Sequence, residues 1–134
     1  MDTGPFIAYI NGRDPAHAAV AARLDAFTGL LVTTGAVVTE VMYFLSDVPG
    51  GPVAFAELLV ASGTRIVESS DPNLVRAAAE LMARHSDTPM DFADATLVQL
   101  ADAVGVTDIL TLDRRGFSTY RTAKGKAFRL VALP

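Results

Sequence analysis

Glu40 is a carboxylate in a segment whose other side chains are mostly apolar. Residues 36–46 are predicted to form a helix, and the positions three and four away from Glu40 on that helix are all apolar: Ala36, Val37, Tyr43 and Phe44. A carboxylate on such a face must be paired, bound to a cation or protonated, unless its head reaches water at the rim of the face. Glu40 is therefore either a ligand or a solvated rim residue.

Asp94 repeats this pattern in a second predicted helix. Leu97 and Val98 follow it at helical spacing, and Asp91 lies one turn before it on the same side. Both acids also have a structural interpretation, because the amino end of a helix favours negative charge and side-chain caps. That interpretation is stronger for Asp91 than for Asp94.

Two further acids adjoin predicted elements. Asp113 follows the apolar segment 109–112, at the carboxyl end of a predicted strand, where parallel sheets bind their ligands. It could equally cap a short helix that follows. Asp2 opens the chain shortly before the apolar segment 6–10 and indicates little by itself.

Carboxylates from four separate segments can converge only around something positive, since they otherwise repel one another. The chain has no Cys and only two His, so zinc is a poor candidate. Clustered oxygen ligands favour Mg²⁺ or Mn²⁺. Such a site can deprotonate a water and bind a phosphodiester for in-line displacement.

The charge distribution suits a phosphodiester substrate. Residues 1–113 carry all 15 acids and 5 bases, whereas residues 114–134 carry no acid and 6 bases. An acidic body with a basic end can hold cations and still attract a polyanion to one edge. The alternative is a solvated tail. The bases expected to contact a phosphate backbone are Arg114, Arg115, Arg121, Lys124 and Lys126.

Short apolar runs alternate with helical segments along the chain. Strands are predicted at 30–33, 64–67, 108–112 and 128–131, and helices from Asp14-Pro15 to Gly29, at 36–46, at 53–62, from Asp71-Pro72 to about His85, and at 92–103. This alternation favours an α/β fold, with a parallel sheet covered by helices on both faces. The 134 residues fit one domain, residues 1–134.

Composition limits location and partners. The longest uncharged run, residues 26–39, is too short and too polar to span a bilayer, and no basic-then-apolar opening indicates a secretory signal. A cytoplasmic location is expected. A mean hydropathy of +0.35 is high for a small domain and suggests an apolar surface for a partner.

The chain resembles PIN-domain proteins, and in detail the VapC-type toxin ribonucleases of type II toxin–antitoxin systems. No single motif is specific, but the ordered set of four is fairly specific and spans nearly the whole chain. The matching stretches are Asp2–Ala8, Thr33–Thr34 with Thr39–Val41, Met90–Ala95 and Leu110–Phe117.

The resemblance implies a three-layer α/β/α sandwich with a central, mainly parallel sheet. It implies a Mg²⁺- or Mn²⁺-dependent endoribonuclease, usually a homodimer, silenced by a cognate antitoxin protein. The residues that it assigns are Asp2, Glu40, Asp94 and Asp113 as catalytic metal ligands, Asp91 as an auxiliary acid, and Thr3 and Thr111 as side chains that orient a ligand or a water. Helices 36–46 and 53–62 are candidates for the dimer or antitoxin surface, with ordinary core as the alternative.

Two positions depart from the family pattern. The family has an apolar strand before its first Asp, whereas only Met1 precedes Asp2 here. Either the native start lies upstream or the domain tolerates a short first strand, which could loosen the position of Asp2. Arg115 stands where relatives often carry another acid, which should weaken any second metal site and strengthen substrate contact.

Other functions were weighed against this one. A catalytically inactive PIN-like domain that binds RNA or protein is the main alternative. The triplet Asp2-Thr3-Gly4 also matches aspartic proteases, but those need two such Asp residues in an all-β fold. A phosphate-receiver domain would need an acid pair and a Lys that are not apparent. His17 and His85 are expected to be structural or solvated rather than general bases.

Overall fold

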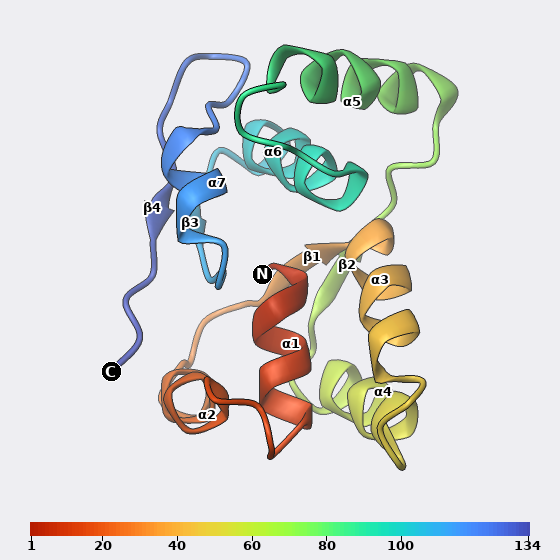
Figure 1. Cartoon of the computed structure of the whole chain (residues 1–134), viewed down its shortest axis with the longest axis vertical. Helices are drawn as coiled ribbons and strands as arrows, with labels where there is room; N and C mark the ends of the chain where they lie inside the picture. The colour runs from red at the N-terminus through yellow and green to blue at the C-terminus, as the bar shows by residue number, and fades with distance from the viewer.

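The strands of this protein are short and lie in the middle of the molecule, between two groups of helices (Figure 1). The computed structural model describes residues 1–134. Its elements, in chain order, are α1 (Thr3–Ile10), α2 (His17–Asp25), β1 (Val32–Thr34), α3 (Gly35–Leu45), α4 (Gly51–Ala61), β2 (Arg65–Val67), α5 (Pro72–Arg84), α6 (Phe92–Val104), β3 (Asp108–Ile109), α7 (Arg114–Thr119) and β4 (Arg129–Leu130).

The sheet consists of two parallel pairs joined by the first two residues of the chain. β1 pairs with β2, and β3 pairs with β4. Between the pairs, the Met1 amine donates to the Val32 carbonyl at 2.6 Å, and the Asp2 amide donates to the Leu110 carbonyl at 3.0 Å. Met1 and Asp2 thus lie between the two strand pairs and connect them through these hydrogen bonds, but they form no strand of their own, so a full first strand is absent, as expected.

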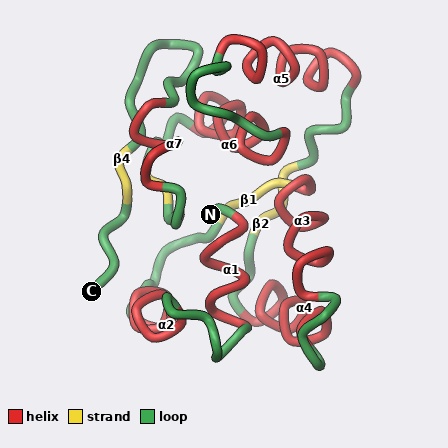
Figure 2. Tube along the Cα trace, in the orientation of Figure 1, coloured by secondary structure: helices red, strands yellow, loops and turns green.

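Helices cover both sides of these strands (Figure 2). Contacts join α1 with α2, α3 and α4 in one group, while α5 packs on α6 in the other, and α6 also contacts β1. This arrangement agrees with the predicted α/β/α layering, although the strands are shorter than predicted. β3, for example, ends at Ile109 rather than at Leu112.

Several helix boundaries follow from local chemistry in the sequence. The Asp71 carboxylate accepts from the Asn73 amide at 2.8 Å and begins α5 ahead of Pro72. α6 ends at Gly105, whose φ of 71° lies in the left-handed region that glycine adopts without strain. These boundaries match the predicted helices to within one or two residues. The helix predicted from Asp14-Pro15 to Gly29 is shorter than expected, since α2 spans only His17–Asp25 and has no side-chain cap.

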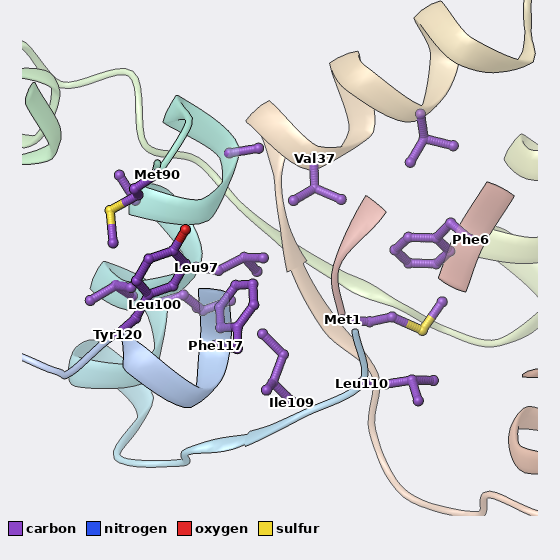
Figure 3. Close-up of a cluster of buried hydrophobic side chains, with 14 of the residues drawn as sticks. Met1, Phe6, Val37, Met90, Leu97, Leu100, Ile109, Leu110, Phe117 and Tyr120 are labelled. Carbon is purple, nitrogen blue, oxygen red and sulfur yellow. The ribbon is translucent and has the colours of Figure 1, made fainter. Parts of the chain in front are cut away.

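The core lies between the helix groups and around the central residues Met1 and Asp2. Phe6 and Phe55 stack edge to face with ring centroids 5.1 Å apart, and both rings are fully buried. Figure 3 shows part of this cluster, in which Met1, Leu110 and Val37 extend from separate elements toward a common interior. The site-bearing segments are therefore joined through one packed interior.

An apolar groove of about 450 Å³ opens beside Met1, near the amino ends of β1 and β3. Leu24, Phe27, Leu31 and Ile109 are among its lining residues. None of the predicted metal-binding acids lines this groove.

No helix of this chain combines the length and the apolar character that crossing a bilayer requires.

Candidate active site

Asp2 is held in place by three separate contacts, although it lies in no strand. It caps α1, where its Oδ1 accepts from the Thr3 amide at 2.6 Å, and its Oδ2 accepts from the Thr111 hydroxyl at 2.5 Å. The third contact is the hydrogen bond that the Asp2 backbone amide donates to the Leu110 carbonyl. Burial raises the pKa of Asp2, and the Asp91 charge acts in the same direction. The lack of a strand at this point therefore does not leave Asp2 loosely placed.

Glu40 lies at the rim of the α3 stripe and faces Asp2. The stripe is only partly core: Val37 is fully buried, whereas Tyr43 and Phe44 are exposed. The Glu40 carboxylate accepts from the Thr3 hydroxyl, so the residue that follows Asp2 also ties down Glu40. Partial burial raises the pKa of Glu40, and the charges of Asp91 and Asp2 raise it further.

Asp91 and Asp94 form a reciprocal cap at the start of α6. The Asp94 amide donates to Asp91 Oδ1 at 2.8 Å, and the Asp91 amide donates to Asp94 Oδ2 at 3.2 Å. Burial, followed by the charges of Asp91, Asp2 and Asp113, raises the pKa of Asp94 to about 7. The capping interpretation is confirmed for both residues, since this pair of side chains begins the helix. Their role as metal ligands stays a prediction.

Asp113 caps α7 with one carboxylate oxygen, and its second carboxylate oxygen takes no part in the cap. Its Oδ1 accepts from the Gly116 amide at 2.9 Å, and its own amide donates to the Thr111 hydroxyl oxygen at 2.9 Å. Thr111 therefore links Asp2 and Asp113. A Cβ at Gly116 would lie 2.1 Å from Asp113 Oδ2, so only glycine leaves room for this carboxylate.

Three further residues position the acids and were not singled out from the sequence. Thr34, which caps α3, shares a buried hydrogen bond of 2.8 Å with Thr96 of α6, and so joins the two helices that carry Glu40 and Asp94. The Tyr120 hydroxyl oxygen and Asp113 Oδ2 flank the same glycine, Gly116. Burial, followed by the charges of Asp94, Asp113 and Asp91, raises the pKa of this hydroxyl. Thr34 lay within a recognised stretch, whereas Thr96 and Tyr120 carried no sequence signal.

Acids from four parts of the chain thus influence one another across a small region. No three of the His, Asp and Glu side chains already form a cage around a common point. Several carboxylate oxygens are instead used in hydrogen bonds to helix amides and threonine hydroxyls. The donors are all oxygens, so their chemistry, though not their present placement, suits a hard divalent cation. The raised pKa values reflect burial and mutual repulsion.

The basic residues beside the acids have no carboxylate partners. Arg114 and Arg115 follow Asp113 in the first turn of α7 and are exposed, as are Lys124 and Lys126. Arg121 is also exposed, but its guanidinium donates to the carbonyls of residues 118–120. The one ion pair of the chain joins Arg129 to Asp108, away from this set.

Both histidines bond to nearby backbone carbonyls. Nδ1 of His17 lies 2.8 Å from the Ala8 carbonyl oxygen, and Nδ1 of His85 lies 2.8 Å from that of Leu81. These contacts agree with the predicted structural role for both residues.

Comparisons with known proteins agree with this architecture. A family model described as the PIN domain matches residues 1–123. The chain is similar to the ribonuclease VapC26 of Mycobacterium tuberculosis, with 33% identity over 132 residues that cover 98% of each protein. Its fold is similar to a crystal structure of VapC20 from the same organism, a sarcin-ricin loop cleaving toxin, with a TM-score of 0.76 over 86% of this chain and 89% of that one at 22% identity. Together with the coupled acids, these matches show that the chain belongs to the PIN domain family, among the VapC-type proteins.

Proposed function

We propose that this protein is a Mg²⁺- or Mn²⁺-dependent endoribonuclease and the toxin of a toxin–antitoxin pair. Proteins of this type act on RNA, pair with antitoxins and generally depend on divalent metal ions. The observation that carries the proposal is that acids from separate segments are tied together: Thr111 bonds both Asp2 and the Asp113 amide, and Thr3 bonds Glu40. In keeping with this, burial and then the charges of Asp91, Asp2 and Asp113 raise the pKa of Asp94. A set of acids that repel one another in this way is stabilised by a bound divalent cation.

The acids would divide the work as follows. Asp2, Glu40, Asp94 and Asp113 would hold the ion, with Asp91 as an auxiliary acid. Thr3 and Thr111 orient Glu40 and Asp2 through their hydroxyls. When bound, the ion supplies an activated water and neutralises charge on the phosphodiester. No protein nucleophile is required.

The basic residues would bind the RNA backbone next to the acids. Arg114 and Arg115 directly follow Asp113, so a phosphate held by them lies beside the proposed metal site. Arg121, Lys124 and Lys126 would extend the contact along the strand, because exposed cations without acidic partners release counterions on binding a polyanion.

Helices α3 and α4 would form a homodimer surface. They expose large apolar side chains, among them Tyr43 (74% exposed), Val53 (68%) and Val60 (79%), on the two helices expected to contact a partner. We propose a homodimer that acts on RNA in the cytoplasm and is silenced when the cognate antitoxin binds it. Sedimentation equilibrium tests this homodimer. The wild-type chain should have the mass of a dimer and the Val60→Lys variant that of a monomer. The same mass for both chains would contradict this surface.

Cleavage of total cellular RNA tests the central proposal. The purified chain should cut RNA with Mn²⁺ but not with EDTA, and Asp94→Asn should lower the rate more than about 100-fold, since even outer partners of a metal site typically contribute 10–100-fold. Asp87→Asn is the matched control, because Asp87 is exposed and outside the acid set. The new ends should lack 2′,3′-cyclic phosphates, since water and not the ribose hydroxyl is the nucleophile.

Two results would contradict the proposal. One is equal cleavage with EDTA, and the other is an Asp94→Asn variant that cuts as fast as the wild-type chain. Retained RNA binding without any cleavage by the wild-type chain would instead favour an inactive PIN-like binding module.

A further inference from the structure

Tyr120 is a fully buried tyrosine at the carboxyl end of α7, the short helix that Asp113 caps. Its ring packs edge to face against Phe117 and His85, with centroids 5.2 Å apart in both cases. Figure 3 shows the ring beside Phe117 and Leu100, with the hydroxyl directed to the side where Met90 lies. The ring is therefore held on two sides, and the direction of its hydroxyl is fixed by packing.

The Tyr120 hydroxyl binds the loop that leads into α6. It donates to the Pro89 carbonyl at 2.6 Å, a contact between residues 31 positions apart. Pro89 is two residues before Asp91, which caps α6 and shares the reciprocal cap with Asp94. The hydroxyl thus attaches the end of α7 to the start of the acid-bearing helix.

On its other side, the Tyr120 oxygen faces the α7 cap. A Cβ at Gly116 would lie 2.9 Å from the Tyr120 hydroxyl oxygen and 2.1 Å from Asp113 Oδ2, so both atoms flank the same glycine. The carboxylates of Asp94 and Asp113 also act on this hydroxyl electrostatically. Tyr120 therefore places one neutral polar atom among the acids of α6 and the acid of α7.

We propose that Tyr120 is a positioning residue for the metal site, which sets the placement of Asp94 relative to Asp113 by fixing the loop at Pro89 against α7. The inference rests on the proposed metal-dependent function. Ligand groups need placement to within about 0.5 Å, and this is supplied by locked neighbours and their hydrogen bonds. Loss of the hydroxyl would free the α6 start while leaving every acid in the chain.

Tyr120→Phe tests this role, because it removes the hydroxyl and keeps the ring. We expect Mn²⁺ affinity, measured by isothermal titration calorimetry, to fall about 10-fold, the lower end of what outer partners of metal sites contribute. In RNA cleavage, the Mn²⁺ concentration for half-maximal rate should rise, while the rate at saturating Mn²⁺ stays near that of the wild-type chain. Tyr9→Phe is the matched control, since it removes a hydroxyl that bonds Asp25 at 3.2 Å on the surface.

Thermal melting in EDTA separates positioning from plain stabilisation. A Tyr120→Phe chain with a lower melting temperature but unchanged Mn²⁺ affinity and unchanged Mn²⁺ dependence of cleavage would overturn the inference and leave the proposed function standing. Absence of Mn²⁺ binding by the wild-type chain would overturn both. Titrations at 10 °C, with the folded fraction followed by near-UV circular dichroism, keep the comparison valid if the variant is less stable.

Discussion

The hydroxyl of Thr111 donates to Oδ2 of Asp2 at 2.5 Å and so joins residues 109 positions apart. The same hydroxyl oxygen accepts from the Asp113 amide at 2.9 Å. One buried side chain therefore fixes the first acid of the chain and the backbone of the last, across the centre of the sheet.

Thr111→Val should weaken the metal site without removing an acid. The variant keeps the shape of the side chain but leaves Asp2 Oδ2 without its donor, so we expect a 10–100-fold loss in Mn²⁺ affinity or cleavage rate. Loss of this buried contact should also lower the free energy of unfolding by about 1–3 kcal/mol. Thr64→Val is the control, since the Thr64 hydroxyl bonds only Ser62 on the surface. Equal Mn²⁺ affinity in wild type and Thr111→Val would refute the assigned role.

Gly116→Ala should displace Asp113. The new methyl would meet Asp113 Oδ2 at 2.1 Å, closer than any real contact, so the carboxylate must rotate or the first turn of α7 must shift. Cleavage should fall more than about 10-fold. Gly12→Ala is the matched control, because a Cβ there meets nothing within 4 Å. Similar RNA cleavage rates for the two variants would show that cleavage does not depend on the position of the Asp113 carboxylate.

The stability of the metal-free protein should depend on Asp94 protonation. The folded state raises the pKa of Asp94 from 3.8 to about 7, so it binds this proton more tightly than the unfolded chain does. The contribution of Asp94 to stability therefore falls as pH rises through this window. The Met1 amine has the opposite effect on stability. Burial lowers its pKa from 8.0 to about 6, so its contribution to stability rises as pH rises through this window.

Melting temperatures in EDTA across pH 5 to 8 measure the Asp94 effect, provided that wild type is compared with Asp94→Asn. The amine titrates in both chains, so it cancels in the difference. The advantage of the variant over wild type should grow as pH rises, and Mn²⁺ should reduce it. A difference that does not change with pH would show that Asp94 is not held in this repulsive setting.

Replacing Arg114 and Arg115 by Ala should weaken RNA binding and flatten its salt dependence. Each phosphate contact on a single strand contributes roughly 0.7 to the slope of log affinity against log salt, so the slope should fall by about 1.4. Arg76→Ala with Arg84→Ala is the control, because it makes the same change in net charge on exposed positions of α5. Equal slopes for the two double variants would place the RNA contact elsewhere.

Local chemistry in the sequence determined much of this protein. Asp71-Pro72 and Gly105 bound their helices through contacts made within a few residues, so the sequence suffices to predict them. The alternation of helices and strands and the ordered acid motifs likewise identified the family and its α/β fold. The misplaced carboxylates Glu40 and Asp94 were detectable because a charge on an apolar face needs a partner.

Only the tertiary structure decided how those acids are held. The bonds from Thr111 to Asp2 and from Tyr120 to Pro89 join segments 109 and 31 positions apart, and no local pattern encodes such pairs. The strands were also overpredicted, because their length depends on neighbours: β1 pairs only with β2 and β3 only with β4, each along a short ladder. Local propensity sets where elements begin and end, whereas packing between distant segments sets which side chains meet.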